Sequence, residues 1–504
     1  MTVLAAPAAA EIKQAATTGG TVEGESANGL SMFKGIPFAA PPAGANRWRA
    51  PQPVIPWVGV RRTVEFGPAC MQGETLARQM GSTAPLSEDC LYIDVWTPAG
   101  AATDKLPVIA WIHGGGFNSG MSSVPLYDGA NLARQGIVFV SINYRLGPFG
   151  FLATPELSAE GGQGSGNYGL LDQIRGLEWV RDNVANFGGD PTNVTMMGHS
   201  AGGQAVSNLA ASPLARGLFH KVIAESGSSF QPVQTSAPWG GAIIAALPFA
   251  EAGGKAWLER LGVRTLAEAR AFPAAALDEA QRAQGSPRFA PVADGNLIPG
   301  DHYELWKSKK FNDVPVLLGA NSFEAPSRTH ITPAAFEQMV RTNYGDRAEA
   351  VLRAYPHATD AEAQRSTGML NSDSTFLWPA YTWARLQSGN GKAPVFTYWF
   401  HRPTAQSPDG SAHGAEVALV FGNEDARRTA WTAEDRALSR QLQSYWINFA
   451  KTGNPNGAGL PLWPQFAAGR ETVMQLGAEA KPIPLPGAQR LAALDEYFAW
   501  RRGM

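Results

Sequence analysis

Residues 193–203 read Asn193-Val194-Thr195-Met196-Met197-Gly198-His199-Ser200-Ala201-Gly202-Gly203. The apolar run at the start is typical of a short buried strand, and the small residues after Ser200 favour the beginning of a helix. Glycine at 198 and 202 lets the backbone turn sharply, because a side chain at either position would clash in so tight a turn. In a chain with 55 glycines this pattern also arises by chance. Its interpretation as a turn that presents the Ser200 hydroxyl above a sheet edge therefore depends on the rest of the chain.

The composition is that of an ordinary globular protein. The 504 residues are 44% hydrophobic and 17% charged, with a formal net charge of −2. This balance lacks the electrostatic footprint of proteins that bind nucleic acid or acidic membranes. No apolar run is long enough to span a bilayer. The chain has no metal-ligand motif and no dinucleotide fingerprint, so we expect neither a metal nor an organic cofactor.

Short β-branched runs predict several further strands, with amphipathic helical stretches between them. The predicted strands cover residues 106–112, 137–143, 194–197, 221–224 and 314–318. Strands that alternate with helices indicate an α/β fold with a doubly wound, mostly parallel central sheet flanked by helices.

Helical periodicity predicts one helix over residues 171–184 and another after the capping box of Thr432 and Asp435. The Ala-rich region 240–285 predicts a helical excursion from the sheet. We expect an N-terminal tail over residues 1–20 and a single domain over 21–504. The apolar start of the tail fits either a signal-peptide remnant or a loose cytosolic terminus, because it is short and lacks a basic segment.

A glycine-rich segment, His113-Gly114-Gly115-Gly116-Phe117, follows the strand predicted at 106–112. Consecutive glycines allow main-chain N–H groups to converge on one point, which is what stabilisation of a tetrahedral oxyanion requires. A merely flexible loop is the alternative, but the position upstream of Ser200 favours an oxyanion hole.

A serine nucleophile needs a base and a carboxylate that orients the base, in the chain order serine, acid, histidine for this kind of turn. His413 lies downstream in a small-residue loop that can present an imidazole, whereas His401 ends an aromatic run and is predicted to be structural. Glu324 follows the strand predicted at 314–318, where sites on open α/β sheets lie. Taken alone, each residue is more often an ordinary surface side chain.

The two cysteines, Cys70 and Cys90, are separated by a polar segment. Their spacing alone favours a disulfide and two buried thiols equally.

Ordered segments along nearly the whole chain match one family pattern. They lie at 33–39, 87–93, 143–147, 166–203 and 449–455. Through them the chain resembles the type-B carboxylesterases, the α/β-hydrolase family that includes cholinesterases, liver carboxylesterases and bacterial p-nitrobenzyl esterases. The resemblance implies an α/β-hydrolase fold with helical excursions over the active site.

The resemblance implies catalytic roles for three residues. Ser200 matches the nucleophile, His413 the general base, and Glu324 the acid that orients the base. Ser226 matches a serine that supports the acid and base from behind them.

The resemblance further implies that the N–H groups of Gly115, Gly116 and Ala201 form the oxyanion hole. It also implies a disulfide between Cys70 and Cys90, which the spacing had left open.

Two departures from the family pattern bear on the substrate. The segment between the cysteines contains no Trp, so the aromatic platform for a choline group is missing. Where cholinesterases carry bulky aromatics that narrow the acyl pocket, this chain has residues 284–289, with Arg288 and Phe289 as candidate substrate-binding residues. We therefore expect a wide acyl pocket that tolerates a polar or anionic acid.

We predict a carboxylic-ester hydrolase that acts on small-molecule esters through an acyl-enzyme. One alternative is a specialised bacterial esterase for polyanionic acyl groups, such as the tricarballylate esters of fumonisins. Another is a catalytically silent, cholinesterase-like binding protein. We expect a monomer or homodimer that is secreted or periplasmic.

Overall fold

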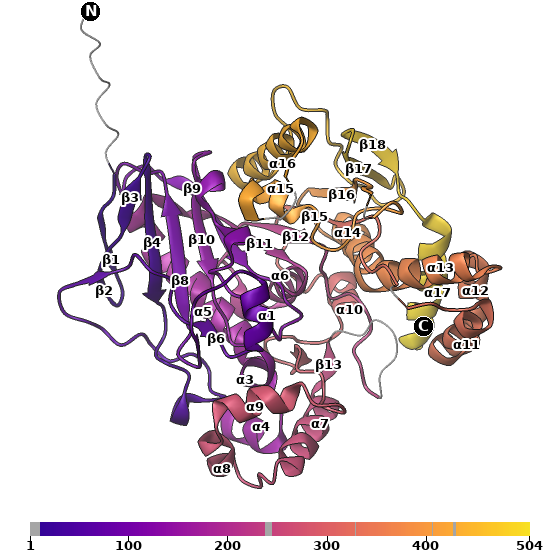
Figure 1. Ribbon diagram of the computed structural model, residues 1–504, viewed down its shortest axis with the longest axis horizontal. Helices are drawn as coiled ribbons and strands as arrows, with labels where there is room; N and C mark the ends of the chain where they lie inside the picture. Colours follow the sequence, from indigo (N-terminus) through magenta and orange to yellow (C-terminus); the bar gives the residue numbers. More distant parts are fainter. Residues whose placement is uncertain (1–10, 237–243, 328, 406, 427–429) are drawn as a thin grey trace, which may run out of the picture.

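The computed structural model describes residues 11–236, 244–327, 329–405, 407–426 and 430–504. Within these ranges, one large sheet of eleven strands runs through the molecule (Figure 1). Its strands, in spatial order, are β18 (Lys481–Pro484), β17 (Thr472–Gly477), β16 (Val395–His401), β15 (Val316–Asn321), β12 (Lys221–Glu225), β11 (Gly189–His199), β9 (Leu106–Ile112), β10 (Val138–Ile142), β8 (Tyr92–Thr97), β4 (Leu30–Pro37) and β3 (Glu25–Ala27). All neighbours from β17 to β10 are parallel, and the outer pairs are antiparallel. This confirms the predicted α/β fold with a mostly parallel sheet.

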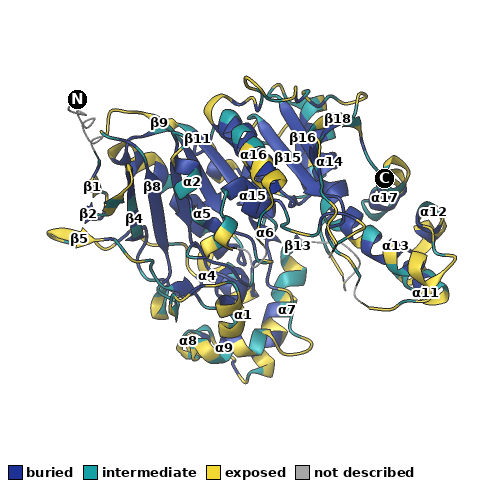
Figure 2. Ribbon diagram, turned by 45° about the horizontal axis from the view of Figure 1, so that its top comes forward, coloured by how far each residue is buried: buried dark blue, intermediate teal, exposed yellow. Residues whose placement is uncertain are grey.

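Helices pack on both faces of the sheet, and others lie to its sides (Figure 1). They are α1 (Glu74–Gln79), α2 (Ala130–Ala133), α3 (Gly147–Phe151), α4 (Pro155–Gly161), α5 (Tyr168–Asn183), α6 (Ala201–Ala211), α7 (Leu247–Arg260), α8 (Leu266–Ala271), α9 (Ala274–Gln281), α10 (His302–Lys307), α11 (Pro333–Tyr344), α12 (Ala348–Ala354), α13 (Asp360–Ser372), α14 (Trp378–Asn390), α15 (Val417–Phe421), α16 (Ala433–Thr452) and α17 (Ala488–Arg501). The sheet is buried throughout its centre, and the exposed residues lie on the outer sides of the helices and in the connecting loops (Figure 2).

Alternate residues of β9 enter two different hydrophobic cores. Val108, Ala110 and Ile112 join the core that contains α5 and α6 residues. Ile109 and Trp111 join the core that contains α16 residues. Because side chains along a strand alternate between the two faces of a sheet, α5 and α6 lie on one face and α16 on the other. Burial on both faces explains why the central strands are continuous apolar runs.

The predicted strands and helices are present, with shifted ends. β9 matches its predicted range, and α16 begins with the predicted capping box of Thr432 and Asp435. β11 begins at Gly189, five residues before its apolar run, because Gly189 pairs with Leu106 across a bulge that precedes Val194. Helices α7, α8 and α9 occupy the described part of the Ala-rich region 240–285; its residues 240–243 lie outside the described residues.

The predicted N-terminal tail contains a strand. β1 (Gln14–Thr17) pairs with β2 (Gly20–Glu23), which pairs with β5 (Val60–Arg62) in a small separate sheet. Residues 1–10 lie outside the described residues. From residue 11 onward, the chain is therefore part of the folded body. No helix among the described residues is long and apolar enough to cross a membrane.

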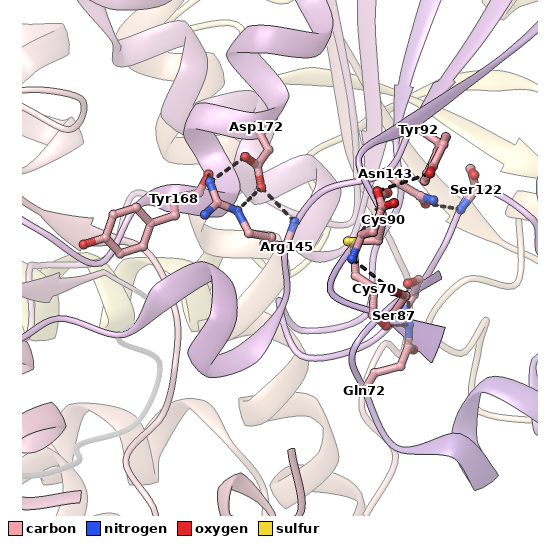
Figure 3. The surroundings of a disulfide bond; sticks show 12 residues. Cys70, Gln72, Ser87, Cys90, Tyr92, Ser122, Asn143, Arg145, Tyr168 and Asp172 are labelled. Atoms are coloured by element: carbon pink, nitrogen blue, oxygen red, sulfur yellow. Dashed lines mark hydrogen bonds and ion pairs between the residues drawn. A yellow bond between two sulfur atoms is a disulfide. The ribbon is translucent and has the colours of Figure 1, made fainter. Parts of the chain in front are cut away.

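A disulfide and a buried ion pair connect the loops beside the N-terminal half of the sheet (Figure 3). Cys70 and Cys90 form a disulfide, in agreement with the resemblance to the carboxylesterases. Arg145, just after β10, forms an ion pair of 2.7 Å with Asp172 of α5, and both side chains are buried. The Asp172 carboxylate also accepts a hydrogen bond from the Arg145 main-chain N–H at 3.0 Å. The pair therefore fixes the loop after β10 to α5.

Replacing Asp172 with alanine is expected to lower the free energy of unfolding by about 3–5 kcal/mol, because the Arg145 guanidinium would stay buried without its counter-charge. Glu74→Ala is the control, because the pair of Glu74 with Arg78 is exposed and exposed pairs contribute little. Urea unfolding followed by circular dichroism measures both variants. Equal stability of the two variants would contradict the prediction.

Candidate active site

The connection between β11 and α6 consists of one residue, Ser200. Its backbone has φ 60° and ψ −123°, a conformation that side-chain-bearing residues rarely adopt. A Cβ atom at Gly202 would lie 2.0 Å from the Ile112 carbonyl oxygen, and one at Gly198 would lie 2.5 Å from the Gly202 main chain. Glycine is therefore required at both positions for the strand, the turn and the helix to pack this closely. The Ser200 N–H donates to the Glu225 carbonyl at 2.8 Å, which ties the turn to the end of β12.

Ser200, His413 and Glu324 form a continuous chain of hydrogen bonds. His413 Nε2 lies 2.8 Å from Ser200 Oγ, and His413 Nδ1 lies 2.6 Å from Glu324 Oε2. The three residues follow β11, β16 and β15, whose carboxyl ends meet at one edge of the parallel sheet. Chain segments 89 and 213 residues apart are thus brought together by strand order alone.

The environment of His413 favours its protonated form. Burial lowers the pKa of His413, but the charge and hydrogen bond of Glu324 more than offset burial, and Glu416 adds to their effect. The pKa of His413 is therefore raised above its usual value. Glu324 is itself buried and also accepts the Asn321 N–H at 2.6 Å, so its carboxylate is held in place from two sides.

Glu416 is buried next to these residues. No function was predicted for it from the sequence. Its Oε2 accepts a hydrogen bond from Asn321 Nδ2 at 2.6 Å, and its Oε1 accepts one from Ser226 Oγ at 3.3 Å. Burial and the nearby Glu324 raise the pKa of Glu416 to about 7. Ser226 therefore contacts the site through Glu416. The signal that could have suggested Glu416 is its position three residues after His413 in the same loop.

A second buried carboxyl, Glu225, lies at the end of β12. Its Oε1 accepts a hydrogen bond from Trp446 Nε1 at 2.6 Å. Burial and the neighbouring Glu416 raise the pKa of Glu225 well above its usual value. The resemblance to the family assigns a role to the neighbouring Ser226 and none to Glu225.

His199 is a further titratable residue beside the site. Its ring centroid lies 4.7 Å from that of His413, and its Nε2 lies 4.0 Å from Glu416 Oε1. The ring is mostly buried. The imidazole of His413 thus has carboxylates on one side and a second imidazole on another.

The glycine-rich segment folds into a tight turn against Ser200. A Cβ atom at Gly114 would lie 2.9 Å from the Ser200 Cβ. The Gly115 carbonyl accepts the N–H groups of residues 118 and 119 at 3.1 and 3.0 Å. Within the described ranges, the N–H groups of Gly115, Gly116 and Ala201 donate to no protein acceptor. Three main-chain donors, two in this turn and one next to Ser200 in the chain, are therefore available to a ligand.

The two candidate substrate-binding residues lie in the segment between α9 and β14 (Val292–Ala293). Phe289 is buried and packs edge-on against Trp257 of α7, with ring centroids 4.9 Å apart. Arg288 is exposed. The His401 ring lies 2.9 Å from Ser322 Oγ and stacks on Trp399, as expected of a structural residue.

No group of three or more His, Cys, Asp or Glu side chains is placed to hold a metal ion in the part of the chain that the structure describes.

Comparisons with known proteins place the chain in one family. The family model described as the carboxylesterase family matches residues 11–493. The chain is 34% identical over 489 residues to a fumonisin B1 esterase of Sphingopyxis macrogoltabida, covering 92% of this chain and 86% of that protein. It is 36% identical over 467 residues to a para-nitrobenzyl esterase of Bacillus subtilis, covering 89% and 91%. A solved PNB esterase structure superposes with a TM-score of 0.84 at 32% identity, covering 96% of this chain and 99% of that one.

Proposed function

The chain belongs to the carboxylesterase family and is a carboxylic-ester hydrolase, and we propose that Ser200, His413 and Glu324 perform the hydrolysis. The observation that carries the proposal is the hydrogen-bonded chain from Ser200 Oγ through His413 to Glu324. A hydroxyl, an imidazole and a carboxylate in this order are the elements of an activated serine nucleophile.

In the acylation step, Ser200 Oγ attacks the ester carbonyl carbon while His413 Nε2 removes the hydroxyl proton. Glu324 keeps the His413 ring in the tautomer with a proton on Nδ1 and stabilises the imidazolium that forms. The imidazolium then donates its Nε2 proton to the oxygen of the leaving alcohol. The products of this step are the free alcohol and an acyl-Ser200 ester.

The negative charge that develops on the carbonyl oxygen needs fixed donors. We assign this role to the N–H groups of Gly115, Gly116 and Ala201, which lie beside Ser200 and form no protein hydrogen bond among the described residues. Loss of one such donor typically costs about 10²–10³ in rate.

Deacylation repeats the same chemistry with water. His413 takes a proton from a water molecule, which attacks the acyl carbon, and then returns a proton to Ser200 Oγ as the acid leaves. All proton transfers pass through one imidazole. A catalytically silent binding protein is not favoured, because this chain retains the nucleophile, the base and the acid that such a protein would not need.

We also propose that the protein works outside the cytoplasm, as a secreted or periplasmic enzyme. The support is the Cys70–Cys90 disulfide, because disulfides persist in oxidising compartments and are rare in the cytosol.

For the acyl side of the substrate, we propose that Arg288 favours anionic acids such as tricarballylate. Arg288 is an exposed cation in the segment where related enzymes narrow their acyl pocket. The similarity to a fumonisin B1 esterase supports this proposal.

Ser200→Ala is expected to lower kcat for p-nitrophenyl acetate by about 10⁶, as in serine hydrolases that lose their nucleophile. Release of p-nitrophenol at 405 nm measures the rate, and thermal unfolding checks that the variant is folded. A folded variant that hydrolyses the ester as fast as the parent would refute the serine mechanism.

The pH profile of kcat/KM is expected to fall on the acid side with a midpoint above 6.5, the usual value for histidine. His413 must be neutral to accept the Ser200 proton, and its raised pKa means that protonation begins at a higher pH than in free histidine. Glu324→Gln removes the carboxylate charge and should move the midpoint to lower pH, with a much lower rate. Initial rates on a neutral ester between pH 4 and 9 provide the test, and a flat profile down to pH 4 would contradict it.

Arg288→Ala is expected to lower kcat/KM for a tricarballylate ester by about tenfold, the equivalent of one hydrogen bond to a charged group. The value for a neutral ester should stay within about twofold of the parent. Arg282→Ala is the matched control, because Arg282 is a nearby exposed cation that pairs with Asp278. Equal losses on both esters would count against the role of Arg288.

A further inference from the structure

Gln72, in the loop closed by the disulfide, binds the main chain just after the glycine-rich turn. Gln72 is completely buried, two residues after Cys70 (Figure 3). Its Oε1 accepts the Gly120 N–H at 2.9 Å, and its Nε2 donates to the Gly120 carbonyl at 2.9 Å. Nε2 also donates to the Cys70 carbonyl at 3.1 Å. The side-chain amide therefore holds both main-chain groups of Gly120 and connects them to a disulfide-bonded residue.

Gly120 is in turn packed against the start of the glycine-rich turn. A Cβ atom at Gly120 would lie 2.3 Å from the Gly114 carbonyl oxygen and 2.4 Å from His113 Nδ1. One at Gly115 would lie 2.0 Å from the Ser119 carbonyl oxygen. Residues 119 and 120 are thus in van der Waals contact with residues 113–115. A displacement of Gly120 must displace the N–H groups of the turn.

We propose that Gln72 is a positioning residue for the oxyanion donors of Gly115 and Gly116, and that the Cys70–Cys90 disulfide holds Gln72 in place. The inference rests on the proposed function, because it assumes that these N–H groups bind the oxyanion. Gln72 itself touches no reacting atom and acts through Gly120.

The position of the donors affects the transition state more than the bound ester. The oxyanion is present only after Ser200 Oγ has attacked, so donors displaced by a fraction of an ångström stabilise the transition state less. Binding of the ester in its ground state does not depend on them to the same degree. Loss of the Gln72 contacts should therefore lower kcat and leave KM nearly unchanged.

The first test compares Gln72→Met with Gln387→Met. Methionine keeps the length of the side chain and removes its hydrogen bonds in both variants. Gln387 is a matched control: it is a buried residue of α14, it accepts a hydrogen bond from Trp306 Nε1 at 2.7 Å, and it donates to Asp313 at 3.0 Å. Thermal unfolding should show a lower Tm for both variants.

Gln72→Met is expected to lower kcat by about 10–10², below the full loss of a donor, with KM within about twofold. Its affinity for a trifluoromethyl ketone should fall by the same factor as kcat/KM, because Ser200 Oγ adds to that ketone to form a hemiketal oxyanion. Gln387→Met should keep the kcat and ketone affinity of the parent. The inference is overturned if Gln72→Met matches Gln387→Met in both readouts, or if only its KM changes.

A second measurement uses the unsubstituted enzyme. Reduction of the disulfide with dithiothreitol at a temperature well below Tm is expected to lower kcat and ketone affinity together, with recovery on reoxidation. If reduction leaves kcat unchanged, the role of the disulfide is refuted. If Gln72→Met and the reduced enzyme both unfold, the two features serve folding rather than donor position, and the inference is overturned. Ser200→Ala, assayed in parallel, separates the two proposals. If Ser200→Ala keeps its activity, the serine mechanism is refuted. If Ser200→Ala loses its activity while Gln72→Met is unaffected, only the positioning role is refuted.

Discussion

The close approach of α6 to the ends of β9, β11 and β12 is the constraint on which the rest of the site depends. Gly202 leaves no room for a Cβ against the Ile112 carbonyl, and one at Gly227 would lie 2.0 Å from the Ser200 carbonyl oxygen. The two contacts fix Ser200 from both neighbouring strands. Its left-handed backbone is sparsely populated for a residue with a side chain and persists because the packed surroundings determine it. The same packing places the serine hydroxyl where the histidine from the loop after β16 reaches it.

Parts of the molecule that depend on local chemistry could be predicted from the sequence. The apolar run of β9, the capping box of α16 and the glycines around Ser200 each carry their signal within a few residues. The extension of β11 to Gly189 could not be predicted, because it comes from pairing with β9 across a bulge. The strand β1 was not predicted for the same reason, because it forms by pairing with β2, which in turn pairs with β5.

In the candidate site, too, some residues have a local sequence signal and others do not. Ser200, His413 and Glu324 lie in motifs with a known order along the chain, so three residues could be named. Glu416 follows His413 in the same motif but was assigned no role, because its importance comes from a fold that buries it beside Glu324 and Ser226. A carboxyl in this position can avoid the cost of a second buried charge by taking up a proton. The balance between charge and protonation gives Glu416 a pKa near neutrality. This pKa limits the negative charge that faces His413.

The flexibility of a glycine-rich turn must be limited by the structure around it. Glycine allows the N–H groups to converge, but it also loses more conformational freedom on folding than any other residue. Donors that stabilise an oxyanion are effective only if they need no rearrangement during the reaction. The turn is held from outside: the Gly147 N–H donates to the Phe117 carbonyl at 2.7 Å, and Gln72 holds Gly120. One of these contacts comes from a loop closed by the disulfide, so the rigidity of the site extends to a covalent bond more than a hundred residues from Ser200 in the sequence.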